Sequence, residues 1–299
     1  LTRINKLDDF IKSPLAVVCH DAGAAHLIVH WLEKYNNNIF ACMEGPARKI
    51  WNSKFPNTRL FSINEAISNA NVLLSGTGWA SNIEHASRIE AKKRGINSIA
   101  VIDHWTDFQG RFIRNNEEIL PDQILVSDDY AEELAVKYFP KTLITQLPNL
   151  YLKNIVDKVL EIKRNSTHSL IKRILIVTEP FRSKLSKDDK DIEHIAIEYF
   201  FNNIDKINTG GNLEVKIRLH PSEDREKYKY VDVAYPEIKI SYSYNHALSK
   251  DLGWAELVVG CQTFALVAAL NCKIPTISIL PPEIECPLPH KGILRLRDL

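Results

Sequence analysis

Short apolar runs alternate with amphipathic segments along the first half of the chain. Five runs are apolar enough to be strands buried on both faces, at residues 15–20, 38–44, 71–76, 97–103 and 123–128. The segments between them carry apolar residues at helical spacing, and one ends on Lys92, Lys93, Arg94 and Gly95, which is typical of a helix C-terminus. This repeated strand–helix–strand order predicts a parallel sheet covered by helices.

The alternation pauses over residues 148–169, where one helix and a polar end indicate a connecting segment. It then restarts, with strands expected at 172–179, 213–220, 237–243, 256–260 and 274–280 and helices expected at 190–204 and from Thr263 onwards. We therefore predict an α/β protein with two Rossmann-like domains that face each other across a cleft. Residues 1–150 form the first domain, residues 151–170 a linker and residues 171–299 the second domain.

Composition narrows the class of protein. The chain has 299 residues, 45% of them apolar and 25% charged, which is enough for two ordinary cores. Lys and Arg number 38 against 37 Asp and Glu, so bulk charge predicts no nucleic-acid partner. The apolar runs are much shorter than the roughly 20 residues of a membrane span, and no signal peptide is visible. Five scattered cysteines without a CxxC pair predict reduced thiols in a cytoplasmic protein and no metal site.

Ligands of open parallel sheets bind beyond the carboxyl ends of the strands, so the residues at those ends are site candidates. In the first domain, His20 and Asp21 precede a helix whose N-terminus favours an anion, although helix capping alone would also explain Asp21. Asp103 is a candidate base or sugar-hydroxyl ligand, with strand-end capping as the alternative. His104 follows it in the densely polar segment 102–112.

A glycine-rich turn follows the third expected strand of the first domain. Gly76, Thr77 and Gly78 leave backbone N–H groups for an acidic or hydroxylated ligand, and Trp79 offers a flat ring on which a sugar can stack. A purely structural turn with a packed tryptophan is the alternative.

Three loops of the second domain carry the remaining candidates. Glu179 is a candidate nucleophile, general base or hydroxyl ligand, and Arg182 a ligand for phosphate or carboxylate. Arg218 and His220 end an inner strand, where His220 can donate to a phosphate oxygen and residues Pro221 and Ser222 are expected to start a helix. The third loop contains Gly260, Gln262 and Thr263, and a helix starting at Thr263 would point N–H groups and a hydroxyl at a phosphate, unless Thr263 is only a cap.

The His220-Pro221 pair and the segment GCQTFALVAALNCKIP (260–275) together resemble the nucleotide-binding half of GT-B glycosyltransferases. The similarity is strongest to bacterial sialyltransferases and Kdo-transferases, which use CMP-activated sugars, and it covers residues 172–282. It implies that His220 and Thr263 bind the CMP phosphate, that Arg218 is an accessory contact, and that catalysis needs no metal or other cofactor. Gln262-Thr263 stands where those enzymes carry a pair of Ser or Thr residues, and their acidic base motif is absent, so Asp21, Asp103 and Glu179 are candidates by position alone.

The resemblance implies transfer of sialic acid, Kdo or a related acidic sugar from a CMP donor to a glycan or glycolipid acceptor of a capsule or lipopolysaccharide. Three alternatives stay open. A nucleotide-sugar 2-epimerase or hydrolase could use His20 or His26, a CDP-glycerol transferase also uses an HP motif, and a non-catalytic module would need only nucleotide-sugar binding. The basic segment 45–55 could hold the protein at the inner face of a membrane, although a solvated helix face is the simpler interpretation.

Overall fold

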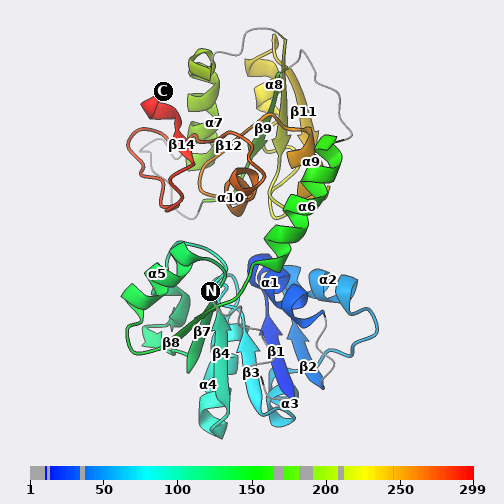
Figure 1. Ribbon diagram of the computed structural model, residues 1–299, viewed down its shortest axis with the longest axis vertical. Helices are drawn as coiled ribbons and strands as arrows, with labels where there is room; N and C mark the ends of the chain where they lie inside the picture. The colour runs from blue at the N-terminus through cyan, green and yellow to red at the C-terminus, as the bar shows by residue number, and fades with distance from the viewer. Residues whose placement is uncertain are drawn as a thin grey trace. The chain divides into compact units, whose positions relative to one another are not determined.

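The computed structural model describes residues 11, 14–33, 38–164, 172–181, 191–207, 212–244 and 246–299. The chain divides into two compact units, Leu1–Tyr151 (unit 1) and Leu152–Leu299 (unit 2). Each unit is a parallel six-stranded sheet with helices packed on it (Figure 1), so the predicted α/β class with two Rossmann-like sheets is confirmed.

The sheet of unit 1 has the strand order β2-β1-β3-β4-β7-β8, and all of its pairings are parallel. The strands are β1 (Leu15–Cys19), β2 (Ile39–Met43), β3 (Val72–Ser75), β4 (Asn97–Val101), β7 (Gln123–Val126) and β8 (Leu143–Gln146). The strand order reverses between β1 and β3, and ligands of such sheets bind at this switch point. A small antiparallel pair, β5 (Ile113–Arg114) and β6 (Glu117–Glu118), follows β4.

Helices cover both faces of this sheet because alternate strand residues enter two separate cores. Val17 packs with α1 (Ala22–Leu32) and α2 (Gly45–Lys54), whereas Val18 packs with α3 (Ile63–Ser68) and α4 (Ile83–Arg94). The remaining helices of this part of the chain are a 3₁₀ turn, η2 (Gly110–Phe112), α5 (Asp129–Tyr138) and α6 (Leu150–Arg164). The predicted linker, residues 151–170, thus lies mostly within α6, and residues 165–170 fall outside the described residues.

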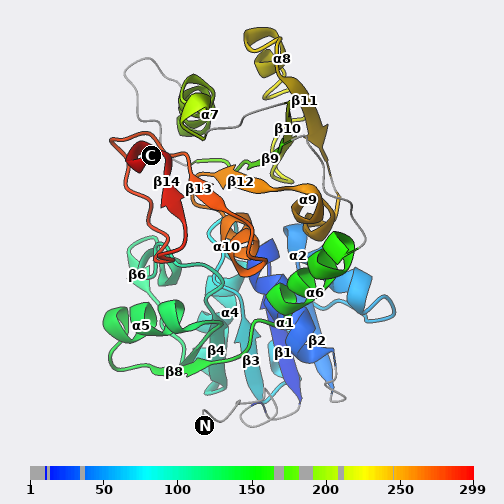
Figure 2. The same ribbon diagram turned by 45° about the horizontal axis from the view of Figure 1, so that its top comes forward.

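Unit 2 has the strand order β11-β10-β9-β12-β13-β14, again entirely parallel (Figure 2). The strands are β9 (Lys172–Val177), β10 (Leu213–Arg218), β11 (Lys239–Ser243), β12 (Leu257–Gly260), β13 (Thr276–Ser278) and β14 (Leu294–Arg295). The helices are α7 (Ile192–Asn202), η3 (Ile204–Ile207), α8 (Tyr230–Ala234), α9 (Leu248–Trp254), α10 (Phe264–Asn271) and η4 (Leu296–Asp298). This order is that of the Rossmann sheet, and its switch point lies between β9 and β12.

One predicted element is wrong. Pro221 and Ser222 form a turn, and the next helix, α8, begins only at Tyr230. The intervening residues are mostly charged, so a helix over them would have no apolar face to bury. None of the helices described has the length and apolar character needed to cross a membrane.

Candidate functional site

The switch point of unit 1 places an aspartate–histidine pair directly after β1. Asp21 occupies the N-cap position of α1, but its side chain makes no capping hydrogen bond. Its Oδ1 instead lies 2.7 Å from Nδ1 of His20. An ionised carboxylate can only accept, so this contact needs a proton on Nδ1, and Nε2 is the ring nitrogen that can act as a base. Capping therefore does not explain Asp21.

Two glycines let carboxylates approach the backbone at this switch point. A Cβ on Gly23, in the first turn of α1, would lie 1.8 Å from Oδ2 of Asp103. A Cβ on Gly78 would lie 2.3 Å from Oδ2 of Asp21. The carboxylates of Asp21 and Asp103 are therefore held against the loops that follow β1 and β3, and they gather at one edge of the sheet.

Asp103 is fixed by Arg111, which lies in the same polar segment, 102–112. Arg111 Nη1 donates to Asp103 Oδ1 at 2.8 Å and to Thr77 Oγ1 at 3.1 Å. Thr77 Oγ1 in turn donates to the Val101 carbonyl at 2.8 Å and is buried, so its hydroxyl serves the loop structure. Arg111 thus joins the ends of β3 and β4 and orients the Asp103 carboxylate.

A buried carboxylate that was not apparent from the sequence, Glu84, also contacts these loops. Glu84 is 1% exposed, and its Oε1 accepts the His20 backbone N–H at 2.9 Å. Burial, and secondarily the charge of Asp21, raises the pKa of Glu84 even though the His20 N–H and Arg88 oppose the shift. The buried face of α4 carries Glu84, Ser87, Arg88 and Ala91. Polar residues at the i, i+3 and i+4 positions of a helix, in line with Ala91 at i+7, were the sequence signal that could have revealed this cluster.

Arg88 links this cluster to the glycine-rich turn. Its Nη1 donates to Ser75 Oγ at 3.2 Å and to the Gly76 carbonyl at 3.1 Å. Burial lowers the pKa of Arg88 to about 10, against the effect of Glu84. A guanidinium with that pKa stays charged at neutral pH, so Arg88 clamps the turn as a cation.

The other candidates of unit 1 lie around this cluster. Trp79 is 55% exposed, so its ring can reach a ligand. His104 Nδ1 lies 3.0 Å from Thr106 Oγ1 and is half-buried. His26 stacks on Tyr151 with ring centroids 4.0 Å apart, and burial lowers its pKa to about 4. His26 is therefore a packed, neutral side chain.

In unit 2, Glu179 bridges the two strands at the switch point. It follows β9, and its Oε1 accepts the Gln262 N–H, after β12, at 2.6 Å. Burial raises the pKa of Glu179 to about 7, and the charges of Glu223 and Glu193 add to the rise while the Gln262 N–H opposes it. Glu179 therefore changes its protonation state near neutral pH. Its neutral form can donate a proton, and its ionised form can accept a hydrogen bond from a nucleotide.

Gly260 allows β9 and β12 to approach closely, since a Cβ there would lie 2.7 Å from the Val177 carbonyl oxygen. Thr263 is the N-cap of α10, and its side chain accepts the Ala265 N–H at 3.4 Å. Thr263 thus caps α10, as one of the two interpretations of the sequence predicted. Burial, with Glu179, holds the pKa of the neighbouring Cys261 thiol well above its usual range, so Cys261 supplies no thiolate at neutral pH.

His220 presents a free ring nitrogen beyond β10. The Ser222 backbone N–H lies 3.3 Å from Nδ1, and the Ser222 hydroxyl lies 2.7 Å from it, so Nδ1 accepts and Nε2 carries the proton. Loss of solvent around the ring, with the charges of Arg218 and Lys227, lowers the pKa of His220 despite Glu223. The neutral ring therefore offers an N–H donor of the kind that a phosphate oxygen accepts.

A second residue missed from sequence, Glu223, positions His220. Its Oε2 accepts the His220 backbone N–H at 2.9 Å and also the hydroxyl of Thr178. Burial would raise the pKa of Glu223, but hydrogen bonds from Thr178, Tyr228 and Lys227 outweigh it and lower the pKa. Glu223 stays ionised and ties the β10 loop to the β9 loop that carries Glu179.

Arg218 is already engaged by the protein. Its Nη1 donates to Oδ2 of the buried Asp251 at 2.5 Å, and its Nη2 donates to the His246 carbonyl at 2.9 Å. The structure thus places Arg218 in an ion pair that fastens α9 to β10. Arg182 lies outside the described residues. Within the described parts of the chain, no group of three or more His, Cys, Asp or Glu side chains is arranged to hold a metal ion.

Two solved structures share this fold across both units. The UDP-GlcNAc 2-epimerase of Neisseria meningitidis, bound to UDP-GlcNAc, aligns with a TM-score of 0.53 and 12% identity over 88% of this chain and 81% of that one. A Listeria monocytogenes protein, to which UDP-N-acetylglucosamine 2-epimerase activity is ascribed, aligns with a TM-score of 0.55 and 12% identity over 88% and 78%. No family model and no curated protein matches the chain. The likeness shows a GT-B-like fold.

Proposed function

We propose that the chain is a nucleotide-sugar enzyme, and specifically a glycosyltransferase whose nucleotide is bound by unit 2. The observation that carries this proposal is the arrangement at the switch point of the Rossmann sheet. Glu179, the start of α10 and the Nε2–H of His220 follow β9, β12 and β10, which are adjacent strands. That is the edge at which Rossmann sheets bind nucleotides.

The phosphate of the nucleotide accepts a hydrogen bond from His220 Nε2 and lies at the N-terminus of α10, where Thr263 caps the helix. Pro221 and Ser222 hold the histidine ring in its orientation, because the Ser222 N–H and hydroxyl fix Nδ1 as the acceptor. Glu179 binds a ribose hydroxyl when it is ionised, and Gln262 keeps its carboxylate in place.

The sugar chemistry is assigned to the carboxylates of unit 1. Transfer requires a base for the attacking hydroxyl of the acceptor, and general bases contribute about 10²–10⁴-fold. Asp103, oriented by Arg111, and the His20–Asp21 pair are the two groups able to take that proton. The exposed ring of Trp79 and the half-buried ring of His104 bind the sugars. The turn of Gly76, Thr77 and Gly78 is buried, and its Gly76 and Gly78 N–H groups donate to the Val18 carbonyl and the Glu84 carboxylate, so it holds the loop and does not bind a ligand as the sequence predicted.

The HP pair and the segment 260–275 support a CMP-activated acidic sugar, such as sialic acid or Kdo, as the donor. A glycan or glycolipid of a capsule or lipopolysaccharide is then the acceptor, at the cytoplasmic side of the membrane. No nucleic acid and no cofactor takes part in this scheme.

A second candidate function is 2-epimerisation of a nucleotide sugar such as UDP-GlcNAc. It is favoured by the fold shared with the Neisseria meningitidis enzyme, which was solved with UDP-GlcNAc. The His20–Asp21 pair could serve as its base, since Nε2 of His20 is unprotonated in the neutral ring. An epimerase would act without any acceptor sugar.

Product analysis by NMR separates the two functions. Purified protein is incubated with CMP-N-acetylneuraminic acid, CMP-Kdo or UDP-GlcNAc, with and without a mixture of acceptor glycans. Release of CMP that depends on the acceptor supports the transferase. Conversion of UDP-GlcNAc to its 2-epimer without acceptor would replace it by the epimerase, and intact donors in every mixture would contradict both.

A further inference from the structure

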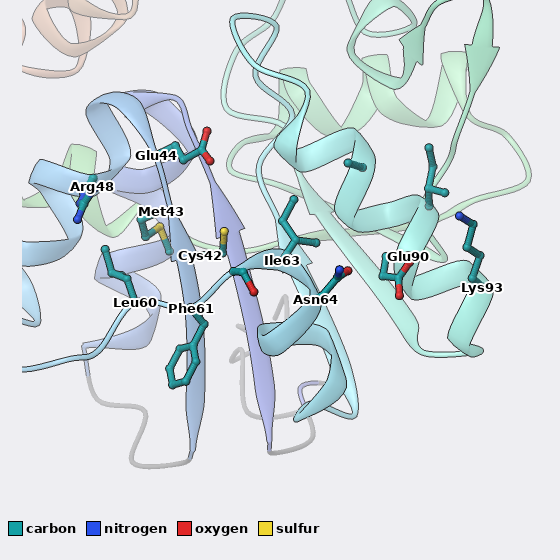
Figure 3. A pocket seen from close by; sticks show the side chains of 13 residues that line it. Cys42, Met43, Glu44, Arg48, Leu60, Phe61, Ile63, Asn64, Glu90 and Lys93 are labelled. Atoms are coloured by element: carbon teal, nitrogen blue, oxygen red, sulfur yellow. The ribbon is translucent and has the colours of Figure 1, made fainter.

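A cavity of about 690 Å³ lies in unit 1 (Figure 3). We call it the β2 cavity, because Cys42 and Met43 at the end of β2 form part of its wall. Arg48 from α2, Asn64 from α3 and Lys93 from α4 also line it. Its volume falls within the roughly 300–1,000 Å³ of small-molecule sites.

The walls of the β2 cavity are held in place by local hydrogen bonds. Ser62 and Glu65 form a reciprocal capping box at the start of α3. Glu90 Oε1 accepts from Arg94 Nε at 2.6 Å, and Arg94 also donates to Ser68 at 2.5 Å, which ties α4 to α3. A wall braced in this way is shaped before a ligand arrives, and that lowers the entropy cost of binding.

The charges around the cavity are unbalanced. Glu90 is neutralised by Arg94, whereas Arg48, Lys93 and Glu44 have no ion-pair partner among the residues that the structure describes. Figure 3 shows Arg48 and Lys93 at opposite ends of the cavity. Burial and the charge of Glu44 raise the pKa of the Cys42 thiol to about 11, so the thiol is neutral. Two cations and one carboxylate around a partly apolar wall fit an anionic molecule with hydroxyl groups.

One end of the cavity adjoins the His20–Asp21 pair. The Glu44 N–H donates to the Cys19 carbonyl at 3.1 Å, and the Ala47 N–H donates to the His20 carbonyl at 2.9 Å. A Cβ on Gly45 would lie 2.4 Å from His20 Nε2, so the histidine ring rests against the residue that follows Glu44. A hydroxyl bound at Glu44 therefore lies on the side of the cavity nearest the candidate base.

From this arrangement we infer that the β2 cavity binds the acceptor, and that the acceptor is an anionic saccharide. Arg48 and Lys93 bind its carboxylate or phosphate groups, and Glu44 accepts one of its hydroxyls. The term acceptor rests on the transferase function proposed above, whereas binding of an anionic saccharide in the cavity stands on the cavity alone.

Binding is tested on the full chain with N-acetylneuraminic acid, its disaccharide and neutral N-acetylglucosamine, by saturation-transfer NMR and titration. Each cation has a matched control on its own helix, since Lys49 and Lys92 are exposed and do not line the cavity. Arg48→Ala and Lys93→Ala should each weaken binding of the disaccharide, which carries two carboxylates, about tenfold, the worth of one charge-assisted hydrogen bond, and at least one of them should do so for the monosaccharide. Lys49→Ala and Lys92→Ala should leave it unchanged, and N-acetylglucosamine should bind more weakly than the acidic sugars.

The inference is overturned if no acidic sugar binds, if neutral sugar binds equally well, or if the control variants weaken binding as much as Arg48→Ala and Lys93→Ala. Titration of the same five proteins with CMP and UDP keeps the two proposals apart. Loss of acidic-sugar binding with intact nucleotide binding supports the cavity assignment. Absence of nucleotide binding in the wild-type chain would contradict the proposed function whatever the sugars do.

Discussion

Replacing Glu179 by Gln should stabilise the protein at neutral and alkaline pH. The pKa of Glu179 rises from 4.5 to about 7 in the folded chain, mainly through burial. The folded state therefore holds a proton that the unfolded state has lost between these two values. Stability contributed by the neutral carboxyl is fully present below about pH 4.5 and is lost as the pH rises through about 7.

Each pKa unit corresponds to about 1.36 kcal/mol. Ionisation of Glu179 therefore lowers the free energy of unfolding by about 3 kcal/mol once the pH has passed about 7. Glutamine keeps an oxygen that can accept the Gln262 N–H but never ionises. The free energy of unfolding of Glu179→Gln should therefore exceed that of the wild type increasingly from about pH 5 to about pH 7, and then by a constant amount.

Urea unfolding followed by circular dichroism, at a series of pH values from about 5 to about 8, measures this difference. Glu283→Gln is the matched control, because Glu283 is an exposed glutamate of the same unit. A difference between Glu179→Gln and wild type that does not change with pH would contradict the raised pKa of Glu179, and so would an equal change in the control.

Three further predictions concern single residues. Gly260→Ala should lower the free energy of unfolding by about 1–3 kcal/mol in urea titration, because its Cβ would meet the Val177 carbonyl at 2.7 Å; an unchanged midpoint would contradict that close approach. Asp251→Ala should cost about 3–5 kcal/mol in the same assay, since it leaves Arg218 without its buried partner; a loss below about 1 kcal/mol would show that the pair is solvated. Asp103→Asn should reduce kcat about 10²–10⁴-fold for whichever nucleotide sugar the wild type turns over, with nucleotide affinity unchanged. Full activity of this variant would exclude Asp103 as the base.

The strands of both sheets were largely predictable because most are continuous apolar runs buried on both faces. β1 and β12, for example, are fully buried and lie within the expected runs 15–20 and 256–260. β8 was missed because it is a four-residue edge strand whose Leu143 is 61% exposed. β14 and the helices α8 and α9 are also too short for their periodicity to be recognised.

The site was only partly predictable, because side-chain partners depend on strand order. The sequence indicated His20, Asp21 and Asp103 from their positions after strands, and the structure gathers them at one sheet edge. It gave no indication that Arg218 would be bound by Asp251, a residue 33 positions later in the chain. The buried Glu84 was missed because its helix was interpreted only by its C-terminal signal.

Calorimetric titration of wild type and His220→Ala with CMP, CDP, UDP and inorganic phosphate tests whether this edge of unit 2 binds a nucleotide. We expect a nucleotide to bind to the wild type and loss of the Nε2–H donor to weaken binding about tenfold. Selective binding of CMP would support the acidic-sugar donor, and preference for UDP would favour the epimerase. Absence of binding by every nucleotide, or equal affinity in His220→Ala, would contradict the assignment of the nucleotide site to this edge of unit 2.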